Sequence, residues 1–103
     1  MSSQLTFRKG AYVPGTSQGL TTTGTSQQCA AFTANVSIVR VAVNQDTYLA
    51  IGTNPTATVN SLLMPAGSVE FFAVDSTDLI AVLQVSVAGR VSITELTSLS
   101  TLN

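Results

Sequence analysis

The fold is decided by Val36-Ser-Ile-Val-Arg-Val-Ala-Val43 and by four further apolar, β-branched runs that follow it. The four are Thr47-Tyr-Leu-Ala-Ile-Gly52, Ser68-Val-Glu-Phe-Phe-Ala-Val74, Leu79-Ile-Ala-Val-Leu-Gln-Val85 and Arg90-Val-Ser-Ile-Thr-Glu-Leu96. Short runs that are rich in valine, isoleucine and aromatic residues, and bounded by turn residues, are typical of β-strands. No helical periodicity of useful length lies between them. The sequence therefore predicts an all-β chain.

Turn-forming residues separate the five runs. Asn44-Gln-Asp46 predicts a hairpin turn, because asparagine and aspartate tolerate left-handed backbone and cap their own turns. In Met64-Pro-Ala-Gly67, proline and glycine occupy their preferred positions in a type I turn. Further turns are expected at Gly52-Thr-Asn-Pro55, Asp75-Ser-Thr-Asp78 and Ala88-Gly89. This spacing predicts a small antiparallel β-sandwich or a jelly-roll-like barrel.

The chain divides into an extended N-terminal arm, residues 1–27, and a β-sandwich domain, residues 28–103. The arm is rich in Ser, Thr, Gln and Gly, a composition that buries too little apolar area to order itself. Such a segment is ordered only when it lies on its own domain or on a neighbour, and we favour a neighbour. Gln28-Cys-Ala-Ala-Phe-Thr33 is predicted as the first strand of the domain, and residues 56–63 as a loop or a weak edge strand.

Several of the predicted strands are apolar on both faces. Val39, Val41 and Val43 share one face of their run, yet Ile38 lies on the other face. A strand with one exposed face alternates apolar with polar residues instead. Either the arm and loops cover the sandwich on both sides, or its outer face is a subunit interface. Arg40 and Glu70 lie in the middle of two strands and are expected to pair across the sheet.

Length and charge limit the classes of function. A chain of 103 residues makes one domain with one modest core. Hydrophobic residues are 45% of the chain and charged residues only 9%, so we expect much of the surface to be covered in use. The net charge of −1, without a basic stripe, predicts no nucleic-acid partner. No apolar stretch approaches the roughly 20 residues that span a bilayer, and the first residues lack the order of a signal peptide.

The chain has little reactive chemistry. It contains no histidine, which excludes histidine-dependent triads and histidine metal sites. Cys29 is the only cysteine, so it forms no internal disulfide, and we interpret it as a buried, inert thiol. Asp75 and Asp78 are better explained by turn chemistry than by Ca²⁺ binding. We therefore expect no catalytic residue, no metal, no cofactor and no small-molecule substrate.

Seven short segments together resemble a known family of proteins. They are Ile38-Val-Arg-Val-Ala-Val43, Tyr48-Leu-Ala-Ile-Gly52, Asn54-Pro-Thr-Ala-Thr58, Met64-Pro-Ala-Gly67, Glu70-Phe-Phe-Ala-Val74, Ile80-Ala-Val-Leu-Gln84 and Val91-Ser-Ile-Thr-Glu-Leu96. Their succession of strands and turns is similar to that of the small all-β virion proteins of tailed bacteriophages, the capsid decoration or cement proteins. The resemblance covers residues 36–96, includes no invariant reactive residue and leaves out the arm.

The resemblance implies a structural protein on the capsid exterior, made in the host cytoplasm. Its expected partners are the major capsid protein and its own copies, as a homotrimer, with the arm as a clasp. Candidate contact residues are Phe7, Arg8, Lys9, Tyr12, Leu20 and Arg40. Arg8-Lys9 either anchors the arm to an acidic patch or is solvated. The alternatives are a neck, tail or fibre-base component of a phage particle, and a glycan-binding module that would need an aromatic or polar cluster.

Overall fold

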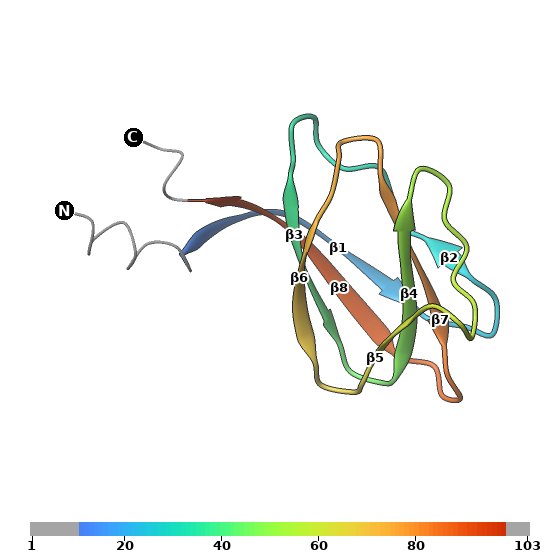
Figure 1. The fold of residues 1–103 in the computed structure, drawn as a ribbon. Helices are drawn as coiled ribbons and strands as arrows, with labels where there is room; N and C mark the ends of the chain where they lie inside the picture. The colour runs from blue at the N-terminus through green and yellow to red at the C-terminus, as the bar shows by residue number, and fades with distance from the viewer. Residues whose placement is uncertain (1–10, 99–103) are drawn as a thin grey trace.

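A computed structural model describes residues 11–98 of the chain (Figure 1). The described residues form eight strands: β1 (Tyr12–Thr21), β2 (Gln27–Gln28), β3 (Ile38–Val43), β4 (Thr47–Gly52), β5 (Leu62–Met64), β6 (Val69–Ala73), β7 (Leu79–Gln84) and β8 (Arg90–Ser98). The first sheet has the order β1-β8-β3-β6, and the second has the order β2-β7-β4-β5. Every neighbouring pair is antiparallel. The prediction of an all-β sandwich is confirmed.

The five apolar runs all become strands. The run 47–52 is β4 with the predicted bounds, and the other four differ from β3, β6, β7 and β8 by one or two residues at one or both ends. In the segment 56–63, residues up to Ser61 form a loop and Leu62 begins β5, which lies at the edge of the second sheet. Continuous β-branched runs bounded by turn residues were thus a reliable signal in this chain.

The predicted strand over residues 28–33 is wrong beyond Gln28. Only Gln27 and Gln28 pair with β7. Cys29 and Phe32 then turn into the core, where they are 5% and 7% exposed. The backbone N–H of Thr33 donates to the Glu95 carboxylate at 2.9 Å instead of to a neighbouring strand. A segment that sends two side chains inward and one N–H to a carboxylate leaves the ladder.

The expectation for the arm needs correction over residues 12–21. These residues form β1, which pairs with β8 of the same chain from Tyr12 opposite Ser98 to Thr21 opposite Arg90. A register shift between Pro14 and Ser17 interrupts this ladder. The polar composition of this segment led to the prediction of an arm that lies on a neighbour. An edge strand tolerates such side chains because backbone hydrogen bonds hold it in the sheet. Residues 1–10 lie outside the described residues.

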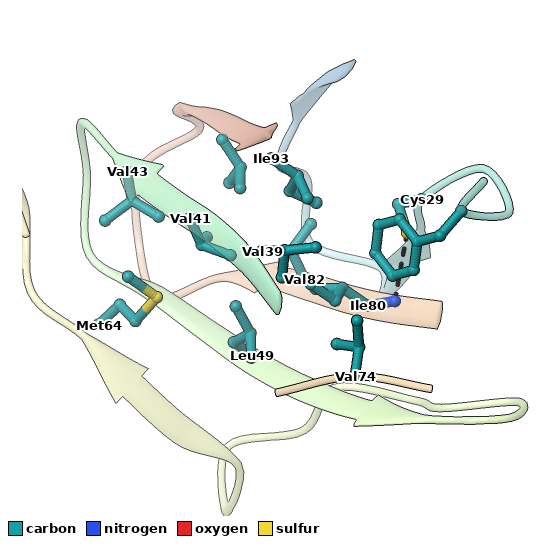
Figure 2. Packing of buried hydrophobic residues seen from close by; sticks show 12 residues of the cluster. Cys29, Val39, Val41, Val43, Leu49, Met64, Val74, Ile80, Val82 and Ile93 are labelled. Atoms are coloured by element: carbon teal, nitrogen blue, oxygen red, sulfur yellow. Dashed lines mark hydrogen bonds between the residues drawn. The ribbon is translucent and has the colours of Figure 1, made fainter. Parts of the chain in front are cut away.

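The core fills the space between the two sheets (Figure 2). The inward faces of β3 and β8 meet those of β4 and β7. Val39 and Val41 are completely buried, as are Ile80 and Val82 from the second sheet. The core cluster consists of Cys29, Phe32, Val39, Val41, Val43, Leu49, Met64, Val74, Ile80, Val82, Val91 and Ile93. At roughly 25 cal/mol per Å² of apolar area, this burial is the main source of stability.

Candidate functional site

The outer face of the second sheet is partly covered by the loop between β4 and β5. Pro55 and Ala57 in this loop are buried. The Gln28 side-chain amide donates to the Pro55 carbonyl, and the Ala57 N–H donates to the Ser26 hydroxyl, both at 2.8 Å. Ala81 is completely buried although it alternates along β7 with core residues that point inward. The sequence left two explanations for the apolar outer faces, cover by the arm and loops or a subunit interface. For this part of the second sheet, the protein's own loop provides the cover.

The outer face of the first sheet has a shallow hollow of about 430 Å³, which we call the outer patch. Phe71 on β6 is 51% exposed in it, and neighbouring Val69 on the same face is 40% exposed. The outer patch is lined by Tyr12, Pro14, Ser17, Arg40, Phe71, Thr94 and Leu96. Because these residues come from all four strands of the sheet, the sheet itself holds the surface in shape.

Side chains from the two edges of the first sheet meet over the outer patch. The ring of Tyr12, from β1, stacks on the ring of Phe71, from β6, with centroids 5.9 Å apart and an interplanar angle of 28°. The Ser17 and Thr94 hydroxyls are hydrogen-bonded at 2.7 Å. Stacked aromatic rings and satisfied hydroxyls give a preformed surface with little side-chain freedom left to lose on binding.

Arg40 is on β3, which lies between β6 and β8, and the residues opposite it on both neighbouring strands are uncharged. In the register it faces Phe71 on one side and Thr94 on the other. Glu70 pairs with Val41 instead, one position along. Successive side chains of a strand point to opposite faces, so Arg40 lies on the outer face and Glu70 on the inner one. The predicted ion pair of Arg40 with Glu70 across the sheet is therefore wrong.

The described charges are separated by sign. Arg40 and Arg90 are the two basic residues between 11 and 98, and both alternate with inward core residues and so lie on the outer face of the first sheet. None of the five carboxylates lies on that face. Asp46, Asp75 and Asp78 are in turns, and Glu70 and Glu95 are on the inward sides of β6 and β8. The face thus combines apolar side chains with positive charge alone.

A second apolar surface lies where the edge strands β5 and β6 face each other, and we call it the β5–β6 opening. Leu62 and Leu63 are 51% and 50% exposed there. The opening is a hollow of about 270 Å³ lined by Leu62, Leu63, Met64, Pro65, Ser68, Glu70 and Phe72. Glu70 is the charged residue of this set and is exposed. The β5–β6 opening therefore combines apolar side chains with a negative charge.

The structure brings two of the predicted contact residues together. Tyr12 and Arg40 both line the outer patch. Leu20 lies opposite Val91 and packs against the core, so it is not part of this surface. Phe7, Arg8 and Lys9 lie outside the described residues. Phe71, which is half exposed in the outer patch, was not among the predicted residues, although its place on the second apolar face of its run was a signal that could have found it.

The reactive side chains have structural partners. The Cys29 thiol accepts a hydrogen bond from the Ile80 N–H at 3.2 Å, and burial raises the pKa of this thiol (Figure 2). The Asp78 carboxylate accepts from the Asp75 N–H at 2.9 Å, which confirms the turn interpretation of these two residues. Among residues 11–98, no three potential ligand side chains gather to hold a metal ion.

No family model, no curated protein and no solved structure matches the chain. In the described part of the chain, no helix is long and apolar enough to cross a membrane.

Proposed function

We propose that this protein is a structural virion protein that binds the outside of an assembled phage capsid and stabilises it by protein contact, without catalysis. The observation that carries this proposal is the outer patch, a preformed apolar surface in which Phe71 is half exposed. The β5–β6 opening gives the same small domain a second exposed apolar surface. A protein that contacts several neighbours at once, its own copies and a shell, needs more than one such surface. The capsid as partner rests on the resemblance of residues 36–96 to decoration proteins.

The physical effect follows from linkage. A protein that binds an assembled shell, and not its separate subunits, stabilises the assembled state by mass action. A hundredfold excess of free protein over its dissociation constant contributes about 2.7 kcal/mol per site. Because a shell repeats the same site many times, small contributions add over the particle. This function requires contact area and fixed shape, which the two sheets supply, and it requires no reactive group.

Co-sedimentation with shells tests the proposal. Purified protein is mixed with empty, expanded shells of the phage that encodes it, or with the unassembled capsid protein, and each mixture is separated on a density gradient. We expect the wild type to move with the shells and not to bind the unassembled protein. Phe71→Ser, which removes the largest exposed side chain of the outer patch, should be retained less by at least about tenfold.

A matched control keeps this test specific. Val59 is 69% exposed and lies in the loop between β4 and β5, outside both apolar surfaces. Val59→Ser removes a comparable exposed apolar side chain and should leave retention unchanged. Equal binding of the wild type to shells and to unassembled protein, or no binding to shells, would contradict the proposed function.

A further inference from the structure

The outer patch and the β5–β6 opening are complementary in charge. Each is an exposed apolar hollow, one lined in part by Arg40 and the other in part by Glu70. We propose that the outer patch of one copy of this chain docks on the β5–β6 opening of the next copy, where Arg40 binds Glu70 of that copy. The proposal deepens the proposed function, on which it rests, by making a second copy the occupant of the outer patch. Copies joined in this way bind the repeated sites of a shell together, through the surfaces that the contact leaves exposed, so Phe71→Ser weakens retention on shells by separating the copies.

Arg40 and Glu70 cannot satisfy each other within one copy. Arg40 faces Phe71 across the sheet and Glu70 faces Val41, so their side chains leave the first sheet on opposite sides. Among residues 11–98, none of the five carboxylate side chains lies on the face of Arg40. Each charge lies among apolar residues, where docking of an uncharged surface would remove it from water without a partner. Such a loss is costly, so each surface selects an occupant of opposite charge.

The charges also decide which surfaces meet. Two copies that met outer patch to outer patch would bring two Arg40 side chains together, and two β5–β6 openings would bring two Glu70 side chains together. Like charges brought together in an interface repel each other, which disfavours both arrangements. The contact therefore joins unlike surfaces. Repetition of such a head-to-tail contact closes a ring where the rotation allows it.

The exposed apolar side chains supply the affinity. Phe71 at the outer patch and Leu62 and Leu63 at the opening are each about half exposed in the single chain. Aromatic side chains such as Phe71 are enriched in the cores of protein interfaces, and docking removes the exposed apolar area of all three side chains from water. The charged pair then fixes the register of the two surfaces, because it forms only when the anchors are correctly placed.

Charge reversal tests the contact in the free protein. The mass of the wild type, Arg40→Glu, Glu70→Arg and the double variant is measured by sedimentation equilibrium over a wide range of protein concentration. We expect the wild type to self-associate, and each single reversal to weaken the association by at least about tenfold. The double reversal restores the pair with its signs exchanged and should recover most of that loss.

Two control variants carry the same change of charge elsewhere. Arg90→Glu reverses a charge on the same sheet face but in a different hollow, and Asp75→Arg reverses one in the turn after β6. Both should associate like the wild type. Far-ultraviolet circular dichroism checks that each variant keeps its β-structure. A monomeric wild type, or a double variant that associates no better than the single ones, would overturn the proposed contact.

The self-association experiment contains no capsid, so its outcome is independent of the shell-binding test of the proposed function. If the protein self-associates through Arg40 and Glu70 but does not bind shells, the contact stands and the capsid function falls. If the reversals leave self-association unchanged while the wild type binds shells, the capsid function stands and this contact falls.

Discussion

At the scale of single residues, burial of Cys29 keeps its side chain protonated as a thiol. Its side chain is 5% exposed in the core, and desolvation raises the pKa of its thiol above the ordinary value of 9.0. A raised pKa in the folded state means that the unfolded chain releases this proton at lower pH. The thiol therefore stabilises the fold below the unfolded pKa, and that contribution is lost as the pH rises through the folded pKa.

This shift predicts that Cys29 makes its own contribution to the pH dependence of the free energy of unfolding. We expect the free energy of unfolding of the wild type, from urea denaturation, to fall more steeply between about pH 8 and pH 10.5 than that of Cys29→Ala. Cys29→Ala leaves a small cavity, which we expect to lower the free energy of unfolding at pH 8 and at pH 10.5 alike. The slopes against pH are therefore compared, and not the absolute stabilities. Parallel slopes would show that the thiol titrates alike in the folded and unfolded chains.

Among the turns, Gly89 marks a close approach between two elements. A Cβ atom added there would lie 2.7 Å from the Cβ of Gln45 and 2.8 Å from the Oδ1 of Asn44, in the turn between β3 and β4. The same Asn44 oxygen accepts a hydrogen bond from the Arg90 N–H at 2.7 Å, so this turn cannot easily move away.

Substitution at this contact should therefore be costly. We expect Gly89→Ala to lower the free energy of unfolding by about 1–3 kcal/mol, since the two turns must separate to accept the methyl group. Gly52→Ala is the matched control, because nothing lies within 4 Å of its added Cβ. Urea denaturation of both variants measures the difference. An unchanged midpoint for Gly89→Ala would mean that the turns yield without strain.

At the scale of elements, β1 decides how much of the N-terminal segment belongs to the sandwich. Removal of residues 1–10 leaves β1 in place, whereas removal of residues 1–21 also takes away every pairing of β8 with β1. We expect the longer deletion to lower the midpoint of thermal unfolding by at least about 5 °C relative to the shorter one. Equal midpoints for the two truncated proteins would contradict the role of β1 as a structural strand.

The elements also show what the sequence could predict. The run 47–52 matched β4 because a turn residue bounds it at each end and its interior is apolar. β1 was missed because an edge strand of Ser, Thr, Gln and Gly is stabilised by backbone pairing, which composition does not record. The pairing of Arg40 with Glu70 failed because the register between two strands depends on their whole faces, and a slip of one residue exchanges those faces.

The candidate site was predictable only in part. The excess of apolar faces in the runs indicated an exposed surface, and Tyr12 and Arg40 do lie on the outer patch. The hollow itself depends on the order β1-β8-β3-β6, which brings Tyr12 from one edge of the sheet onto Phe71 from the other. No local pattern in the sequence encodes that order, so the stacked pair and the β5–β6 opening became visible only in three dimensions.

At the scale of the whole molecule, the proposed function makes this chain a structural part of a phage capsid. The most direct measurement is its copy number in purified particles, by quantitative mass spectrometry against the major capsid protein. We expect on the order of hundreds of copies per particle, in a fixed ratio to the capsid protein, because the shell repeats its binding site over its whole surface. Absence from the particles, or about a dozen copies or fewer as in a neck or tail ring, would contradict it.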